Sequence, residues 1–362
     1  MPTDTNLKTA GQTFSLTAPV TAWGELQSGY DGITRHGDVF TIIGSGFGTQ
    51  PQFAFAGGAT GRIENAALGV DGVDSGGFVL SSERPKEIVN DTERGKVWYS
   101  DVDDGSGASA DNGVIAHDWG SSIPSGSKIY RHFVTKINCD APAYQWKFWR
   151  QEPTFNFSDG GPECYCMFWK KDTGRYFGVR PMVAAGEAVL TYFGGAPYDA
   201  IRMDAPVWFS QDYYQVLGDE GVANGIDFGV INSSVGLLTL FDKTNSLHIE
   251  SGVSLRPRWQ VLQNYLGNYS EGAPTVGEVW VDDFYVQVAP PGSDLIRVYM
   301  TDSPVFSSST MIPEIQAPAS AWTDTALKIS INRGGMTNGT RYLHVVANKN
   351  TVLQTVQIEL GS

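Results

Sequence analysis

Residues 279–288, with the sequence VWVDDFYVQV, decide the fold class because apolar and polar residues alternate along much of the stretch. Alternation with a period of two is typical of a half-buried antiparallel strand. It divides the side chains into two sets on opposite faces. One face has Val279, Val281, Asp283, Tyr285 and Gln287, and the other has Trp280, Asp282, Phe284, Val286 and Val288. We therefore predict a long strand whose two adjacent aspartates face opposite ways.

Similar short runs recur along the rest of the chain. They are rich in Val, Ile, Thr, Phe, Tyr and Trp and are separated by Gly, Asn, Asp and Pro, as expected for strands joined by turns. No long window repeats apolar residues at helical spacing. The runs lie at residues 39–43, 128–137, 144–150, 164–170, 188–193, 207–217, 236–241, 278–288, 295–300, 326–331, 341–347 and 352–360. This pattern predicts an all-β protein built of sandwiches.

Composition excludes several classes of protein. The chain has 362 residues, of which 41% are hydrophobic and 18% charged, so it can bury a core and is not an acidic disordered polymer. Its formal net charge of −14 argues against sequence-independent nucleic-acid binding and against docking on an anionic membrane. No apolar run of about 18 residues predicts a membrane span. The 42 glycines indicate many turns.

Export and disulfide signals are also missing from the sequence. The first residues, MPTDTNLK, lack the apolar core of a secretory signal, so we expect a protein that is not exported by one. The three cysteines, Cys139, Cys164 and Cys166, form neither a disulfide framework nor a zinc ribbon. We expect them to be small buried or half-buried thiols.

The first apolar run, at residues 39–43, lies within the segment 36–48, HGDVFTIIGSGFG, and leads into its glycine-rich end. This segment resembles the opening of an IPT/TIG domain, a small immunoglobulin-like sandwich in which the glycines take positive φ and the phenylalanine fills the core. Segments 295–299, 321–331 and 342–346 resemble the remaining strands of such a domain. We therefore predict one immunoglobulin-like domain split by an insertion, with its first strands in residues 1–56 and the rest in 294–362. Two separate small domains, or a disordered arm plus a C-terminal domain, are the alternatives.

The inserted part is predicted to be a large β-sandwich over residues 57–289, followed by a Pro/Gly linker at 290–293. Segments 118–120 (DWG), 129–136 (IYRHFVTK), 146–150 (WKFWR) and 279–286 (VWVDDFYV) resemble strands of a concanavalin-like, LamG-type jelly roll. That resemblance implies the fold shared by lectins, glycosidases and polysaccharide lyases.

The sequence lacks the catalytic patterns of that fold. A retaining glycosidase would carry Glu-x-Asp-x-x-Glu on one strand, which places two carboxylates on the same face, and no such triplet occurs. The strand motifs of the jelly-roll alginate lyases are absent too. His132, beside Tyr130, is a candidate base, with a buried, hydrogen-bonded sheet histidine as the alternative. We therefore expect no catalysis, and polysaccharide lyase or glycosidase activity is the second hypothesis.

Glycan binding is the function that the jelly roll favours, through aromatic faces and planar polar groups on a sheet. Because sandwich cores also contain large aromatic residues, each tryptophan is a candidate for either role. The candidate glycan-binding residues are Trp146, Trp149, Arg150, Trp169, Tyr192, Trp208, Tyr213 and Tyr214.

A calcium site is the only cofactor site that the sequence suggests. Asp101, Asp103, Asp104 and Asp111 collect carboxylate oxygens in a Gly-rich loop, and calcium prefers oxygen ligands. The spacing departs from an EF-hand loop, so a solvated acidic loop is the alternative.

These observations lead to a hypothesis of a non-enzymatic bacteriophage virion protein, which decorates the capsid or tail or takes part in adhesion. The domain combination resembles uncharacterised phage virion proteins. Its partners would be other virion proteins and host surface polysaccharide, with neither nucleic acid nor membrane among them. A symmetric homo-oligomer is compatible with the sequence. The alternative is an extracellular carbohydrate-binding protein or a polysaccharide lyase of the same fold.

Overall fold

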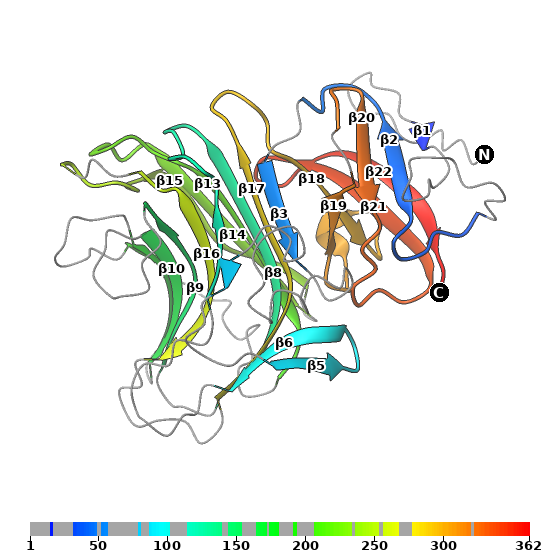
Figure 1. Cartoon of the computed structure of the whole chain (residues 1–362), viewed down its shortest axis with the longest axis horizontal. Coiled ribbons are helices and arrows are strands. Elements are labelled where there is room, and N and C mark those ends of the chain that lie inside the picture. The colour runs from blue at the N-terminus through cyan, green and yellow to red at the C-terminus, as the bar shows by residue number, and fades with distance from the viewer. Residues whose placement is uncertain are drawn as a thin grey trace.

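The computed structural model describes residues 15–16, 32–48, 52–56, 79–80, 87–101, 114–139, 144–153, 164–171, 174–180, 191–193, 206–233, 236–252, 256–267, 277–319 and 322–362. These residues form an all-β protein of three layers (Figure 1). No helix in this part of the chain has the length and apolar character needed to cross a membrane.

The middle layer, here the central sheet, has the strand order β15-β14-β13-β8-β17-β6-β5, and β3 also pairs with β17. Its strands are β3 (Gln52–Ala56), β5 (Glu87–Asp91), β6 (Gly95–Asp101), β8 (Lys128–Cys139), β13 (Phe209–Val216), β14 (Gly225–Ser233), β15 (Gly236–Ser246) and β17 (Gly277–Ala289). In Figure 1 this sheet lies between the other two layers.

A second sheet, here the outer sheet, has the order β12-β11-β10-β9-β16-β7-β4 and completes the jelly-roll sandwich with the central sheet. Its strands are β4 (Val79–Leu80), β7 (Val114–Asp118), β9 (Tyr144–Glu152), β10 (Cys164–Lys171), β11 (Gly174–Arg180), β12 (Thr191–Phe193) and β16 (Trp259–Gly267).

The third layer is a smaller immunoglobulin-like sandwich with the strand order β1-β2-β20-β19-β18-β21-β22. Its strands are β1 (Ser15–Leu16), β2 (Val39–Ile43), β18 (Ile296–Thr301), β19 (Glu314–Pro318), β20 (Ala326–Ser330), β21 (Gly339–Ala347) and β22 (Thr351–Leu360), with the 3-10 helix η4 (Phe306–Ser308) after β18. β2 pairs with β20 across its whole length, which joins the two ends of the chain in one sheet. The domain boundaries themselves stay a prediction.

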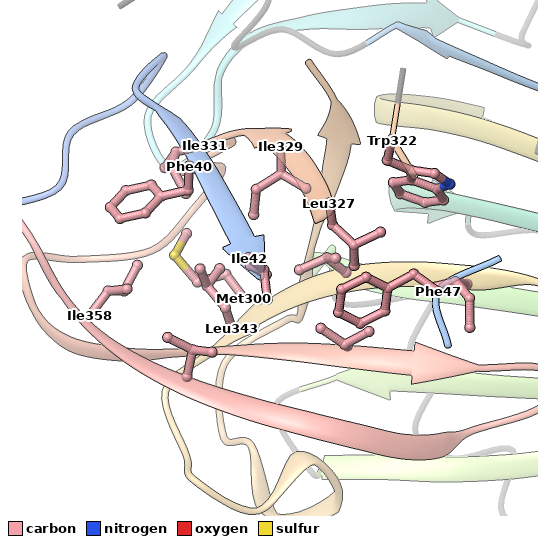
Figure 2. Packing of buried hydrophobic residues seen from close by; sticks show 14 of the residues in the cluster. Phe40, Ile42, Phe47, Met300, Trp322, Leu327, Ile329, Ile331, Leu343 and Ile358 are labelled. Atoms are coloured by element: carbon pink, nitrogen blue, oxygen red, sulfur yellow. The ribbon is translucent and has the colours of Figure 1, made fainter. Parts of the chain in front are cut away.

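The glycine motif after β2 closes this sandwich as its residue types suggest. Gly46 and Gly48 have φ angles of 81° and 66°, and Phe47 between them is 2% exposed. Figure 2 shows Phe47 in the core with residues from β20 and β21, such as Leu327 and Leu343. Burying one such phenylalanine contributes about 1.5–3 kcal/mol to stability.

Strand β17 differs from the strict alternation predicted for it. A β-bulge shifts its register against β8 between Asp282 and Tyr285, and Asp283 has a φ of 52°. The bulge inserts an extra residue, so both aspartates approach the same guanidinium, with Arg94 Nε 2.8 Å from Asp282 Oδ2 and Nη2 3.3 Å from Asp283 Oδ2. The prediction that the two aspartates face opposite ways is therefore wrong.

The immunoglobulin-like sandwich packs on the face of the central sheet that lies opposite the outer sheet. Tyr130, Tyr214 and Tyr285 of the central sheet form a buried cluster with Tyr299 and Phe306. Both faces of the central sheet are therefore covered. The linker at residues 290–293 forms a short turn between the two sandwiches, in which Ser293 N–H donates to Pro290 O at 3.1 Å.

Within the smaller sandwich, His344 is buried and lies between hydroxyl groups. Its Nδ1 is 2.9 Å from Thr355 Oγ1 and its Nε2 is 2.8 Å from Thr301 Oγ1. Burial lowers its pKa from 6.5 to about 4, although a hydrogen bond to the Ser303 carbonyl partly opposes the shift. The neutral imidazole is therefore the form that the fold stabilises.

We expect this histidine to make the protein sensitive to acid. The pKa of His344 is lower in the folded protein than in the unfolded chain. Its contribution to the free energy of unfolding is therefore complete above pH 6.5 and is lost as the pH falls from 6.5 towards about 4. The loss amounts to about 3 kcal/mol, since one pKa unit corresponds to about 1.4 kcal/mol. Urea unfolding at a series of pH values measures it. His344→Gln should lose less stability over this range, and an unchanged pH dependence in the variant would contradict the assignment.

Candidate carbohydrate-binding face

Trp149 of β9 shows which face of the outer sheet is interior. Its side chain is 2% exposed, the guanidinium carbon of Arg131 lies 3.9 Å from its ring centroid, and the ring of Tyr213 lies 6.2 Å away. Arg131 and Tyr213 belong to the central sheet. The face of the outer sheet that contains Trp149 is therefore the one that packs inside the sandwich.

Backbone pairing extends this assignment, because directly paired residues of antiparallel strands share a face. Trp149 pairs with Cys166, and β10 pairs with β11 without a register shift, so alternate positions from Cys166 onward share the interior face. Two successive interior rows are Trp149, Cys166, Val179, Thr191 and Leu262, then Trp146, Phe168, Phe177, Phe193 and Leu266. Nearly all these residues are apolar, as expected for the inside of a sandwich.

The intervening positions form three rows on the opposite side of the sheet, which we call the outer face. They are Gln145, Lys147 and Arg150 of β9, Tyr165, Met167 and Trp169 of β10, Tyr176, Gly178 and Arg180 of β11, Tyr192 of β12, and Val261, Tyr265 and Gly267 of β16. Three of these residues are basic and five are aromatic, and none in these rows is acidic. The pairing thus separates mostly apolar positions on the interior face from positions on the outer face that are rich in aromatic and basic residue types.

The carboxylates of the outer sheet lie in the next row, at one end of the outer face. Trp259 pairs there with both Glu152 and Asp118. Arg258 donates from Nε to Asp118 Oδ1 at 2.6 Å and from Nη2 to Oδ2. These hydrogen bonds from Arg258 lower the pKa of Asp118, so this group stays an ionised carboxylate. It is poorly suited to act as a general acid.

The eight predicted glycan-binding residues do not form one surface. Arg150, Trp169 and Tyr192 occupy positions of the outer face, where Arg150 is 8% exposed, whereas Trp146 and Trp149 occupy positions of interior rows. The other three belong to the central layer and are buried, and these are Trp208, Tyr213 and Tyr214, at 6%, 1% and 5% exposure. Tyr213 contacts the outer sheet and Tyr214 the immunoglobulin-like sandwich, so they face opposite ways.

Sequence reasoning missed five residues of the outer face, namely Lys147, Tyr165, Tyr176, Arg180 and Tyr265. Each is basic or aromatic and belongs to an alternating strand. On β10 and β11, every second residue shares a face with Cys166. Taking the residues in between would have identified Tyr165, Tyr176 and Arg180.

The candidate base His132 is buried in the seam between the central sheet and the immunoglobulin-like sandwich. Its Nδ1 is 2.9 Å from Asp212 Oδ1, which also accepts from Tyr130 and from Tyr299 at 2.5 Å. Burial opposes ionisation of Asp212, but His132 and the two hydroxyls outweigh it and lower its pKa. With Arg297, whose Nε lies 3.2 Å from Tyr299 Oη, these residues form what we call the Asp212 cluster. His132 is 0% exposed, which matches the alternative of a hydrogen-bonded sheet histidine.

The predicted calcium site is largely beyond the part of the chain that the structure describes. Asp101 ends β6, while Asp103, Asp104 and Asp111 lie outside the described residues. Among the described residues, no group of three or more His, Cys, Asp or Glu side chains is arranged to hold a metal ion. The calcium site stays a prediction.

Strand order and core packing define the class of this protein, a concanavalin-like jelly roll combined with a smaller immunoglobulin-like sandwich. No family model and no curated protein matches the chain in sequence. Solved structures with a similar arrangement include alginate lyase vAL-1 from Chlorella virus, at 10% identity and a TM-score of 0.44 over 63% of this chain and 97% of the lyase. A family 16 endo-glucanase from Bacteroides ovatus has 11% identity and a TM-score of 0.37 over 59% and 94%. A Bauhinia forficata lectin in complex with GalNAc has 9% identity and a TM-score of 0.35 over 60% and 94%.

The expectation of a non-enzymatic protein is corrected here, because the similar structures include a lyase and a glucanase. At these identities and TM-scores the likeness assigns no activity to this chain. The virion hypothesis has no support among the structures named.

Proposed function

We propose that the outer face binds an acidic polysaccharide. The observation that carries this proposal is the composition of its three central rows, which contain aromatic and basic residues but no carboxylate. Aromatic rings suit the C–H faces of sugars, and Arg and Lys suit carboxylate or sulfate groups. In a protein with a net charge of −14, three adjacent rows without a carboxylate favour a negatively charged ligand locally.

The dimensions of the face suit a chain of sugars. Strands β16, β9, β10, β11 and β12 lie side by side, and neighbouring strands are about 4.8 Å apart, which gives a width of roughly 19 Å. The basic and aromatic residues are distributed over all three rows. A polymer that crosses the strands would therefore meet several aromatic and cationic positions in succession.

If the bound chain is cleaved, elimination fits these residues better than hydrolysis. Hydrolysis needs one carboxylic acid and one carboxylate beside the scissile bond, and Asp118 is kept ionised by Arg258. Elimination from a uronic acid needs a cation beside the sugar carboxylate and a base for the proton on the carbon next to it. As the double bond forms, the bond to the glycosidic oxygen breaks, and the protonated base returns its proton to that oxygen. Tyr165 and Arg180 are directly paired positions of one row, so Arg180 is the proposed cation and Tyr165 the proposed base.

Affinity electrophoresis in alginate and in a neutral glucan tests the binding proposal. We expect retardation by alginate alone, weakening as salt rises. Arg180→Ala should weaken binding about 10- to 150-fold, since a charge-assisted hydrogen bond contributes roughly 1.5–3 kcal/mol. Arg256→Ala, at a partly exposed ion pair with Glu220 outside the outer face, is the control for lost charge. Equal retardation by both polymers, or equal loss in both variants, would refute the proposal.

Ultraviolet absorbance of an unsaturated product tests the proposed elimination separately. Tyr165→Phe should retain binding to alginate and abolish any rise in absorbance, because it removes only the hydroxyl. A variant that still generates the product would exclude Tyr165 as the base and leave the binding proposal unaffected.

A further inference from the structure

A buried ionic cluster joins the jelly roll to the immunoglobulin-like sandwich. Arg94 lies at its centre, donating to Asp282, to Asp283 and, from Nη1 and Nη2 at 2.8 Å each, to both carboxylate oxygens of Glu314. Asn332 Nδ2 donates to Asp283 Oδ2 at 2.7 Å. The four charged side chains are 0–2% exposed. We call these five residues the Arg94 cluster.

The Arg94 cluster draws on both sandwiches. Arg94 comes from the turn between β5 and β6, and the two aspartates from the bulge of β17, so these three belong to the jelly roll. Glu314 begins β19 and Asn332 follows β20, so these two belong to the immunoglobulin-like sandwich. Every hydrogen bond to Glu314 from Arg94 therefore crosses the seam between the two parts.

The cluster has more negative than positive groups. One guanidinium faces the carboxyl groups of Asp282, Asp283 and Glu314. A second cation, Lys136, shares the Trp208 ring with Arg94, but it is itself paired with Asp91. With all three carboxyl groups ionised, the buried cluster would carry an uncompensated negative charge, which is costly in a low-dielectric interior.

Asp283 is the carboxyl group that relieves this imbalance. Burial, followed by the charge of Asp282, raises its pKa well above the usual range, and Arg94 offsets this only in part. Its Oδ1 has no hydrogen-bond partner among the described residues, so it is the oxygen available to hold a proton. The bulge of β17 thus places a carboxyl group of raised pKa beside the carboxyl group of Asp282, on the guanidinium that also binds Glu314.

We propose that the Arg94 cluster is a proton-dependent latch between the two sandwiches. With a proton on Asp283, the positive charge of Arg94 is shared by Asp282 and Glu314 alone, and Arg94 holds β19 against the jelly roll. When that proton leaves, repulsion among three buried carboxylates weakens the hold on Glu314. Because Asp283 in the folded protein retains a proton that the unfolded chain has already lost, stability falls as the pH rises from the usual carboxyl range towards the raised pKa of Asp283. The latch loosens as that proton leaves.

Hydrogen exchange measured at neutral and alkaline pH tests the latch. The reporter is the amide of Gly335, whose N–H donates to Glu314 Oε1 at 2.9 Å. After correction for the intrinsic exchange rate, we expect the unaltered protein to lose protection at Gly335 and across β19 as the pH rises. Asp283→Asn, which suits a φ of 52°, should retain that protection in alkali.

Asp242→Asn is the matched control, because Asp242 is an exposed carboxylate paired with Lys349 outside the cluster. It should behave like the unaltered protein. Equal loss of protection in Asp283→Asn and in the unaltered protein would overturn the proposal. Infrared spectroscopy of the unaltered protein at neutral pH gives a test that needs no variant. The band of a buried protonated carboxyl group should be present, and its absence would also overturn the proposal.

Discussion

Arg94→Met should lower the free energy of unfolding by about 3–5 kcal/mol, which is the typical cost of removing one partner from a buried ion pair. Methionine fills much of the space of the arginine side chain but supplies no charge. Asp282 and Glu314 would remain in the seam without their cation, at side-chain exposures of 1% each. Urea unfolding, followed by tryptophan fluorescence, measures the change.

Arg256→Met is the control for this substitution. Arg256 pairs with Glu220 at 3.1 Å, but the two side chains are 28% and 33% exposed. Water screens this pair, so we expect a loss of less than about 1 kcal/mol. The loss in Arg94→Met should also shrink in acid, where the stranded carboxylates take up protons. Similar losses in the two variants would show that the Arg94 cluster does not stabilise the seam.

Asp212→Ala should have a comparable effect, again about 3–5 kcal/mol, through the second polar cluster of the seam. The Asp212 carboxylate accepts from Tyr130, Tyr299 and His132, and all three donors are fully buried. Its removal leaves those donors with fewer partners and leaves Arg297 without the nearby negative charge. Thermal unfolding gives the stability change, and near-ultraviolet circular dichroism monitors the two tyrosines.

Asp294→Ala provides the comparison for that variant. Asp294 also joins the two parts, through Lys128 at 3.0 Å, but its side chain is 60% exposed. We expect a loss below about 1 kcal/mol and an unchanged tyrosine spectrum. If Asp212→Ala were no more destabilising than Asp294→Ala, burial would not distinguish the two carboxylates.

The strands could be predicted because alternation is local, whereas the bulges could not. The predicted run at 278–288 lies within β17, but Asp283 adopts a positive φ and the register shifts beside it. A bulge adds one residue without changing the chemical character of its neighbours, so a period-two pattern gives no sign of it. Tyr285 and Gln287 consequently share a face with Trp280, contrary to the prediction.

The candidate site was predicted less well, because a surface depends on the register of several strands together. Trp146 and Trp149 both fall in interior rows, since β9 is bulged at Phe148 and the alternation restarts there. Trp208 and Tyr213 are core residues. Their residue types do not distinguish them from aromatic residues that bind a glycan. Residue type alone thus suggested aromatic candidates, and backbone pairing decided which of them occupy positions of the outer face.

The pairing of β2 with β20 imposes an order of events during synthesis. Gly48 N–H bonds to the carboxylate of Asp324, 276 positions further along the chain. Because the ribosome synthesises the chain from its N-terminus, β2 emerges early. It remains unpaired with β20 until nearly the whole protein has been made. The hairpins of the jelly roll can form during that interval, because β13, β14 and β15 pair in sequence. The immunoglobulin-like sandwich is therefore the last part to close, and a nascent chain stopped before Ala326 would leave Phe40 and Ile42 uncovered for chaperones or proteases to recognise.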